Sequence, residues 1–524
     1  MAKPSREIEA EWRSQTVDVL LSYARKIAAG TDDWADRNHQ AAFLGRIAAG
    51  EDPLGDQYSA AYTAEERRGT GATLTPMPIV SAMVEWATRQ TTSLGMPERV
   101  VDCGAGTGRF AIAAARVFAK THVIAVENDP TMALLLRANV RAAGLKAQIE
   151  LIEADFRTVS LTPTNGPTLF IGNPPYVRHH RIGGEWKRWY VEVLRKHGIK
   201  ASQLAGLHLH FFAKVSELAR EGDYGCFITA AEWLDVGYGS ALRSLLANGL
   251  GGTEVHLLEP TTEAFPGTMT TAAITGFRAG ARASKLRLRR VQKVAELTSL
   301  DGGLDVSWEE ASRAAKWSLL IHPSSKPPEG TIELGELCRV HRGQVTGNNR
   351  IWIAGADAHG LPQAFLKPTV TRAEELIRAE PVLEDDGHLA RVIDLPPTLD
   401  ELAEEERAVV ERFLRWAKGA GAADSYIAQH RNPWWAVRLR QPAPIICTYM
   451  ARRRPAFVRN RAGARLLNIA HGIYPREELS EDQIGQLVTA LISSVRREYG
   501  RTYAGGLTKF EPREIERIPV HWTQ

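Results

Sequence analysis

The four residues Asn173-Pro174-Pro175-Tyr176 have the chemistry to hold a flat amine. The two prolines keep the backbone extended and remove two N–H donors, so backbone carbonyl groups and the Asn173 amide oxygen can act together as acceptors. Tyr176 adds a flat face on which a ring can stack. Acceptors beside a stacking surface suit the exocyclic amine of a nucleobase or the side-chain amide of a glutamine.

The run from Thr168 to Gly172 leads directly into this tetrapeptide. It is mainly apolar, with β-branched and aromatic residues, and therefore predicts a buried strand. The tetrapeptide would then lie at the carboxyl end of a strand, where open α/β sheets bind their ligands. Proline pairs also mark ordinary turns, so the functional interpretation depends on the rest of the chain.

A glycine-rich turn precedes the tetrapeptide in the chain. The residues before and including Asp102 predict a strand that runs into Gly104, Gly106 and Gly108, after which a helix begins. Glycines at such a turn let a ligand lie against bare backbone. The GxGxG spacing, with Asp102 just before it, is similar to the S-adenosylmethionine turn of class I methyltransferases, in which the acidic residue faces the amino-acid end of the cofactor.

Two further acidic residues end predicted strands. Glu127 follows a predicted strand over residues 122–126, where its carboxylate can accept hydrogen bonds from both ribose hydroxyls of a nucleoside cofactor. Asp155 follows the next strand and can accept from an adenine amine, while Phe156 packs on the adenine ring. Together with the glycine turn, these residues predict a cofactor site along one edge of the sheet.

Cationic residues and a second aromatic residue complete the predicted pocket. Arg178, His179 and Arg181 follow Tyr176 closely, and beside a nucleobase pocket they would contact phosphates. Only one carboxylate and no cysteine accompany the histidines, so a metal site is not expected. Phe265 lies on a predicted loop between two strands. It would either join the core or clamp a ring from the side opposite Tyr176.

The segment from Arg431 to Arg476 contains ten arginines and no Asp, Glu or Lys. Aromatic residues are interleaved with them, a combination typical of phosphate contact and base-edge reading rather than of a solvated charged surface. We therefore expect DNA contacts from six of these arginines: Arg438, Arg440, Arg452, Arg453, Arg454 and Arg459. The acidic section from Glu380 to Glu411 has no predicted role.

Length and composition predict several soluble domains. The chain has 524 residues, of which 44% are hydrophobic and 24% charged, values typical of a globular protein with two or three domains. We expect a helical extension at residues 1–65, a catalytic domain at 66–280, a linker region at 281–330 and a DNA-binding domain at 331–524. The tail around Ile515, Ile518 and Val520 should close the last domain.

The sequence also predicts a location. Four cysteines without a CxxC pair argue against a disulfide framework. The polar N-terminus predicts no secretory signal, and no apolar run is long enough to cross a bilayer. We therefore expect a cytoplasmic protein without a membrane partner.

The order of these motifs resembles the gamma-type N6-adenine DNA methyltransferases, the TaqI-like class of restriction-modification systems. The resemblance runs from Thr70 to the C-terminus and is strongest over residues 71–278. It implies an α/β fold of the class I S-adenosylmethionine-dependent type, Rossmann-like with a seven-stranded sheet, followed by a target-recognition domain. It also implies S-adenosylmethionine as cofactor and double-stranded DNA as substrate. A cognate restriction endonuclease is a further partner that the resemblance suggests.

The resemblance assigns roles to individual residues. Its cofactor residues are Thr75, Asp102, Gly104, Gly106, Glu127, Asp155 and Phe156. Thr75 would belong to the loop over the methionine end of the cofactor, although the sequence alone places it as the cap of a helix that begins at Pro76. Asn173 and the Pro174 carbonyl would accept from the target amine. Tyr176 would stack on the target base, with Phe265 as the second stacking aromatic residue.

The implied reaction is methyl transfer to N6 of an adenine. This amine is a weak nucleophile, and two acceptors on its hydrogens would direct the nitrogen lone pair toward the methyl donor. A base inside a duplex cannot reach such a pocket and must be flipped out. Two alternatives stay open: a protein-glutamine methyltransferase, and a DNA-binding modification subunit that needs a partner. The sequence decides neither the recognised DNA sequence nor whether the protein is a monomer or a dimer.

Overall fold

The computed structural model describes residues 6–31, 37–62, 73–259, 265, 271–281, 283–314, 316–321, 330–355, 360–502 and 507–522. The chain forms two compact units, Met1–Ser324 and Ser325–Gln524, each of which is described by itself. No helix among the described residues is long and apolar enough to cross a membrane.

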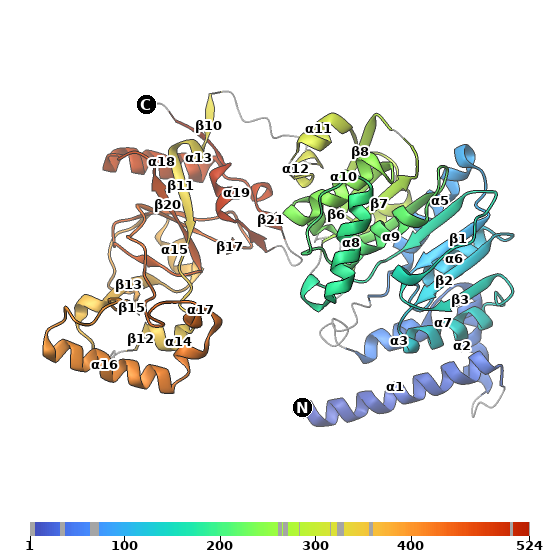
Figure 1. Cartoon of the computed structure of the whole chain (residues 1–524), viewed down its shortest axis with the longest axis horizontal. Coiled ribbons are helices and arrows are strands. Elements are labelled where there is room, and N and C mark those ends of the chain that lie inside the picture. Colours follow the sequence, from blue (N-terminus) through green and yellow to red (C-terminus); the bar gives the residue numbers. More distant parts are fainter. Residues whose placement is uncertain are drawn as a thin grey trace. The chain divides into compact units, whose positions relative to one another are not determined.

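The described residues of the first unit form one nine-stranded sheet with the order β3-β2-β1-β4-β5-β7-β6-β8-β9 (Figure 1). The neighbours among the first five strands pair in parallel, whereas β7 runs antiparallel to both β5 and β6. The strand order reverses between β1 and β4, which is where such sheets bind ligands. The nine strands are β1 (Arg99–Cys103), β2 (His122–Glu127), β3 (Ile149–Glu153), β4 (Thr168–Gly172), β5 (Tyr224–Ala230), β6 (Gly252–Leu258), β7 (Ala272–Arg278), β8 (Lys285–Val291) and β9 (Leu304–Ser307).

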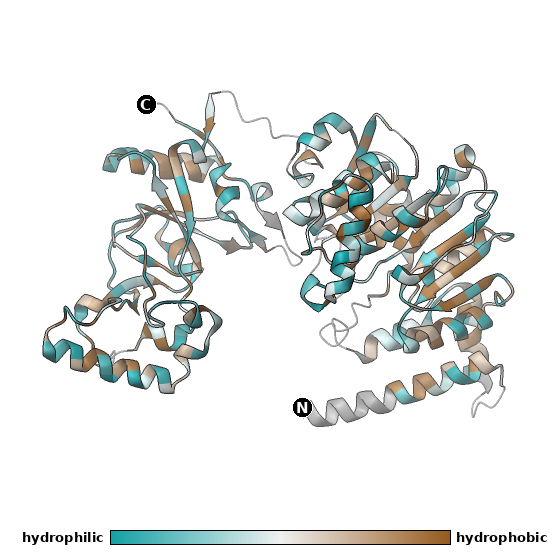
Figure 2. Cartoon of the chain, in the orientation of Figure 1, coloured by the Kyte–Doolittle hydropathy of each residue, from teal (hydrophilic) through white to brown (hydrophobic). Residues whose placement is uncertain are grey.

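Helices cover both faces of this sheet. Because both faces are covered, β1 and β4 are buried along their whole length and are mainly apolar, as the hydropathy colouring of Figure 2 shows for the central strands. Val101 and Cys103 contribute to one core and Val100 to the other. One face carries α5 (Met77–Leu94), α6 (Arg109–Val117) and α7 (Pro130–Ala142). The opposite face carries α8 (Gly184–Lys196), α9 (Leu207–Leu218), α10 (Ser240–Asn248), α11 (Trp308–Arg313) and α12 (Ser318–Ile321).

In the described part of the N-terminal segment, three helices form a further layer outside α7 (Figure 1): α1 (Arg6–Ala29), α2 (Arg37–Ala49) and α3 (Pro53–Ala61). Their buried residues, among them Leu20, Phe43 and Leu54, pack on Met132 and Leu135 of α7. The opposite side of α7 faces the sheet. The N-terminal segment is thus packed on the same unit as the sheet.

The sheet extends beyond the seven strands that the sequence predicts. Residues 285–307 were expected in a linker, but β8 and β9 continue the sheet beside β6. The basic composition of this segment hides an alternating pattern, in which Leu286 and Leu288 are buried between exposed or half-buried charged residues. This is the period of a strand with one face on a core.

The described residues of the second unit form four small sheets. A five-stranded sheet has the order β11-β20-β16-β18-β14 and a four-stranded sheet the order β12-β15-β13-β19. Their strands are β11 (Cys338–Arg342), β20 (Ala470–Pro475), β16 (Ile445–Thr448), β18 (Phe457–Asn460), β14 (Val382–Leu383), β12 (Ile353–Ala354), β15 (Ala390–Ile393), β13 (Leu366–Val370) and β19 (Arg465–Leu466). The smaller sheets pair β10 (Thr331–Glu333) with β23 (Pro519–His521), and β22 (Thr508–Lys509) with β17 (Met450–Ala451) and β21 (Arg501–Thr502).

Helices and the C-terminal tail complete this unit. The helices are α13 (Leu334–Leu337), α14 (Asn349–Trp352), α15 (Ala373–Ala379), α16 (Glu404–Gly419), α17 (Tyr426–Gln429), α18 (Glu481–Ser494) and α19 (Pro512–Glu516). Ile515, Ile518 and Val520 are fully buried in the core that α18 shares with the five-stranded sheet. The prediction that the tail closes this unit is therefore confirmed.

Candidate active site

The glycine turn and the proline tetrapeptide lie side by side at the switch point of the large sheet. The turn follows β1 and the tetrapeptide follows β4, and these two strands are paired with Asp102 level with Ile171. A Cβ atom added at Gly104 would lie 3.6 Å from Cδ of Pro175. Gly104 and Gly106 have φ angles of +82° and +55°, a conformation that side chains disfavour, so glycine is required in this turn.

The side-chain amide of Asn173 has a fixed orientation. Its nitrogen donates one hydrogen bond to the backbone oxygen of Thr73 and another to Oγ1 of Thr75, both at 3.0 Å. A flipped amide would place its oxygen against the Thr73 carbonyl, which can only accept. The amide oxygen Oδ1 is buried and has no hydrogen-bond partner among the described residues. The site therefore presents one oriented and unused acceptor.

Thr75 does not cap a helix as the sequence predicts. The cap position of α5 is taken by Pro76, whose carbonyl accepts from the N–H groups of Ile79 and Val80. The Thr75 hydroxyl instead accepts from Asn173, and Thr75 is almost fully buried. The capping prediction is wrong because the partner of this hydroxyl comes from a strand end far away in the sequence.

Three rings meet beside Asn173. Tyr176 is half-buried, and its ring contacts Phe265 at a centroid distance of 6.5 Å and an interplanar angle of 87°. A base stacked on Tyr176 would therefore meet Phe265 in an edge-to-face contact, so these two rings do not form a parallel clamp. The ring centroid of His208, on α9, lies 6.2 Å from that of Tyr176, and these two rings are also nearly perpendicular.

His208 borders the tetrapeptide, although its sequence position predicts a packed or capping residue rather than a catalytic one. It is 5% exposed, and neither ring nitrogen has a hydrogen-bond partner among the described residues. Burial lowers the pKa of His208 to about 4, so its imidazole is neutral. No sequence pattern marks this residue, because only the packing of α9 places it against Tyr176.

Asp102 is fully buried at the end of β1. Its Oδ2 accepts from the backbone N–H of Ala111 at 2.9 Å, whereas no donor among the described residues reaches Oδ1. Burial raises the pKa of this carboxyl to about 8 against the opposing hydrogen bond, and the nearby Glu127 adds to the rise. A buried carboxyl with one orphaned oxygen suits a cationic ligand group, such as the amino group of an amino-acid moiety.

Glu127 is held across the glycine turn by backbone amides. Its two oxygens accept from the N–H groups of Gly106 at 2.7 Å and Asp129 at 2.8 Å. Burial raises the pKa of Glu127, and these hydrogen bonds oppose the rise. Each oxygen keeps a second lone pair, so the carboxylate can still accept from a pair of hydroxyls.

Asp155 and Phe156 are engaged within the protein. The guanidinium of Arg157 donates to both oxygens of Asp155, and it also lies over the Trp186 ring at 4.1 Å. Burial alone would raise the pKa of Asp155, but the hydrogen bonds and charge of Arg157 hold it below the usual value. Phe156 is 2% exposed and packs on Phe211. Asp155 is half-buried, with 26% of its side chain exposed, whereas Phe156 is buried.

The cations that follow the tetrapeptide lie around a short 3₁₀ helix, His179–Arg181. Arg178 and Arg181 are exposed and His179 is half-buried. Their side chains are accessible to a polyanion.

In the second unit, acidic residues pair with half of the six arginines that the sequence assigns to DNA. Glu380 accepts two hydrogen bonds from Arg454 and lies 3.7 Å from Arg453, and Arg459 pairs with Glu481. Glu380 belongs to the acidic section that had no predicted role. Arg438, Arg440 and Arg452 are exposed.

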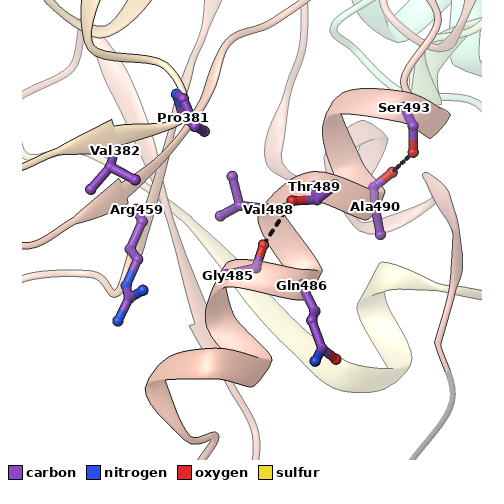
Figure 3. Close-up of a pocket in the computed structure, with 9 residues that line it drawn as sticks. All are labelled: Pro381, Val382, Arg459, Gly485, Gln486, Val488, Thr489, Ala490 and Ser493. Carbon is purple, nitrogen blue, oxygen red and sulfur yellow. Dashed lines mark hydrogen bonds between the residues drawn. The ribbon is translucent and has the colours of Figure 1, made fainter.

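A groove of about 610 Å³ also lies in the second unit, between α18 and the segment that carries Pro381 and Val382 (Figure 3). Gly485, Thr489 and Ser493 line its helical side. Of the predicted site residues it contains only Arg459, so the groove is separate from the strand-end motifs.

The fold and these motifs define a class I S-adenosylmethionine-dependent methyltransferase, and comparisons with known proteins narrow the class. The family model for the Eco57I restriction-modification methylase matches residues 137–257, and that for the C-terminal domain of the type II methyltransferase M.Eco57I matches residues 324–524. A TRM5/TYW2 methyltransferase domain model matches residues 83–177.

Relatives extend the match over most of the chain. The type II methyltransferase M.XamI of Xanthomonas campestris pv. amaranthicola is 54% identical over 86% of this chain and 85% of its own length. M.AccI of Acinetobacter calcoaceticus is 21% identical over 88% and 87%. A solved structure of the type IIL restriction-modification enzyme MmeI with DNA is 12% identical, with a TM-score of 0.56 over 84% of this chain and 67% of that chain, and so shares the fold.

The chain therefore belongs to the type II DNA methyltransferases of restriction-modification systems. S-adenosylmethionine is the methyl donor of this family. The predictions of the family, the α/β methyltransferase fold and the cofactor are thereby confirmed, with nine strands in place of seven. Membership also favours DNA over a protein glutamine as the substrate.

Proposed function

We propose that the protein methylates N6 of an adenine that has been flipped out of double-stranded DNA. The observation that carries the proposal is the buried, unused Oδ1 of Asn173, whose amide is oriented by Thr73 and Thr75. An exocyclic amine has two hydrogens, which Oδ1 and the Pro174 carbonyl would accept together. The choice of adenine over cytosine, whose N4 is also an exocyclic amine, rests on the motif order shared with the N6-adenine class.

The two acceptors supply the catalysis. When they draw on both hydrogens, the nitrogen becomes more tetrahedral and its lone pair leaves the conjugation of the ring. The bound cofactor supplies an electrophilic methyl group. Because the amide orientation of Asn173 exists before the base arrives, little reorganisation is needed during the reaction. Tyr176 replaces part of the stacking that the flipped base loses, and Phe265 closes the pocket edge-on.

We assign the cofactor to the edge between β1 and β2. Asp102 would hold its amino group through the orphaned Oδ1, and Glu127 would accept from the ribose hydroxyls. Gly104 and Gly106 would let it lie against the backbone, with Thr75 over its methionine end. Asp155 and Phe156 would border the adenine, and the hydrogen bonds from Arg157 would hold the Asp155 carboxylate in place there.

We assign the DNA phosphates to exposed cations of both units. In the first unit these are Arg178, His179 and Arg181, which follow the tetrapeptide. In the second unit they are Arg438, Arg440 and Arg452, whereas the pairs of Arg453, Arg454 and Arg459 with carboxylates assign those residues to the fold. We also propose a cytoplasmic location and a cognate endonuclease that cuts the same DNA sequence when it is unmethylated.

The test is transfer of labelled methyl groups from S-adenosylmethionine to unmethylated genomic DNA, followed by base analysis and single-molecule sequencing. We expect N6-methyladenine at one recurring sequence. N4-methylcytosine would overturn the choice of base, and label in protein but not in DNA would restore the glutamine alternative. Cofactor binding without any transfer would favour a subunit that needs a partner.

A further inference from the structure

Asp52, from the N-terminal segment, is buried against the glycine turn. It is 6% exposed and precedes α3, where its Oδ1 accepts from the N–H of Gly55 at 2.9 Å. Oδ1 also accepts from Asn139 of α7 at 2.8 Å, and Oδ2 accepts from Thr107 at 2.5 Å and from Nε of Arg109 at 2.8 Å. Four donors from three elements and the turn converge on one carboxylate.

Arg109 connects Asp52 to Thr75, which lies next to the active site. It is the first residue of α6, and its side chain is 11% exposed. Besides Nε, which binds Asp52, Nη2 donates to Asp56 at 2.7 Å and Nη1 donates to the backbone oxygen of Thr75 at 2.9 Å. The planar guanidinium thus joins two carboxylates of the N-terminal segment to the loop before α5.

Thr75 connects Arg109 to Asn173. Its carbonyl accepts from Arg109, and its hydroxyl accepts from the amide of Asn173. A continuous hydrogen-bonded series therefore runs from Asp52 through Arg109 and Thr75 to Asn173. Asp52 and Thr75 are buried and Arg109 and Asn173 are half-buried. Two members of the series are charged, which makes their hydrogen bonds strong and the loss of these bonds costly.

We propose that Asp52 and Arg109 are positioning residues for methyl transfer, and that the N-terminal helical segment is part of the catalytic machinery. They fix the Thr75 backbone, Thr75 fixes the Asn173 amide, and the amide presents Oδ1 to the target amine. This inference rests on the proposed role of Asn173. A misplacement of about 1 Å can cost about 10²-fold in rate, so a change remote from the target base alters turnover.

The first variant is Arg109→Lys, which keeps the charge beside Asp52 but cannot make the three directed hydrogen bonds. We expect its single-turnover rate at saturating S-adenosylmethionine to fall about 10²-fold, with the cofactor dissociation constant little changed. Asp52→Asn should act in the same direction.

Arg116→Lys is the matched control. Arg116 also joins α6 to the N-terminal helices, by donating to the carbonyls of Ile47 and Ala48 at 3.0 and 2.7 Å, but it does not contact Thr75. This control should keep the wild-type rate. A rate loss in Arg116→Lys equal to that in Arg109→Lys would reduce the N-terminal segment to a structural support and overturn the proposal.

Thr75 supplies a second test that does not depend on the folding of the Arg109 variant. Thr75→Val removes the acceptor for the Asn173 amide and should lower the rate, whereas Thr75→Ser keeps the hydroxyl and should restore it. A fully active Thr75→Val enzyme would contradict the proposal, because the Thr75 hydroxyl would then not be needed to position Asn173. An Arg109→Lys enzyme that binds the cofactor weakly but turns over normally once saturated would also contradict the proposal. In that case the hydrogen-bonded series would support cofactor binding and would not position Asn173.

Asn173→Ala separates this proposal from the proposed function. If Asn173→Ala is inactive and Arg109→Lys is normal, the positioning role fails and the role of Asn173 stands. If Asn173→Ala keeps wild-type turnover, the role of Asn173 fails first. In the Asn173→Ala background Arg109→Lys should cost little further rate, since residues that act through one group are not additive.

Discussion

Arg454 binds the carboxylate of Glu380 with two hydrogen bonds, of 2.8 and 3.0 Å. Glu380 also accepts from the backbone N–H of Phe457, the first residue of β18. The carboxylate therefore ties the acidic section to the arginine-rich segment, and β14 pairs with β18 in the same place. An arginine that the sequence assigns to DNA is thus bound within the fold.

Replacement of Arg454 should reduce stability more than DNA affinity. We expect Arg454→Ala to lower the free energy of unfolding by about 1–3 kcal/mol, because a mostly buried Glu380 loses its two charged hydrogen bonds and keeps, of its charged contacts, only the longer one with Arg453. Urea denaturation would measure this loss. Arg452→Ala is the control, since Arg452 is exposed. Equal destabilisation by both changes would contradict the structural role of the Glu380 pair.

The exposed arginines should give the opposite result. Arg440→Ala and Arg452→Ala should each weaken DNA binding and reduce the slope of log K against log salt by about 1, as expected for the loss of one phosphate contact. Fluorescence anisotropy with a duplex at several salt concentrations measures this slope. If Arg454→Ala changed the slope and these two variants did not, the assignment of DNA contacts within the arginine-rich segment would be reversed.

The local motifs could be read from the sequence because their chemistry and geometry are fixed by neighbours in the chain. A strand followed by Gly104 and Gly106, or by Asn173 and two prolines, specifies a backbone path within a few residues. Parallel pairing of β1 with β4 then brings the two motifs together. The family and the cofactor followed from this order.

Pairings between distant residues could not be read in this way. Asp52 and Thr107 are 55 residues apart, and Glu380 and Arg454 are 74 apart. A single sequence contains no periodicity that links such positions, so the N-terminal segment and the acidic section remained without a role. Even the local pair of Asp155 with Arg157 was missed, because it depends on the side-chain conformation.

The pKa of Asp102 should couple cofactor binding to proton release. Burial raises this pKa to about 8 in the ligand-free protein. A cationic amino group bound beside the carboxyl would lower it, so binding below pH 8 must release a proton. Below pH 8, cofactor affinity should then rise with pH by up to about tenfold per pH unit, until the amino group of the cofactor itself deprotonates at about pH 8.

Calorimetry at pH 7 in two buffers of different ionisation enthalpy would count the released protons. Asp102→Asn is the control, because it keeps the size of the side chain and cannot ionise, while the titration of the cofactor itself is common to both proteins. We expect fewer protons released by the variant. The same number in both would remove Asp102 from the cofactor site.

The ring of Tyr176, rather than its hydroxyl, should carry its function. The hydroxyl is buried and has no hydrogen-bond partner among the described residues, and burial raises its pKa, so it stays neutral and makes no strong contact. Tyr176→Phe should therefore keep most methyl transfer. Tyr176→Ala should lose the stacking of the flipped base, which is worth about 1–3 kcal/mol.

A duplex with a mismatch at the target base provides the control for this stacking role. Unpairing a mismatched base costs less than unpairing a matched one, so part of the cost that Tyr176 offsets is already absent. Where 2-aminopurine fluorescence shows that the mismatched target is already largely flipped in the wild-type complex, the rate lost in Tyr176→Ala should thus be smaller on the mismatched duplex than on the matched one. An equal loss on both duplexes would mean that Tyr176 shapes the pocket without stabilising the flipped base, since a packing role is indifferent to how the base was paired.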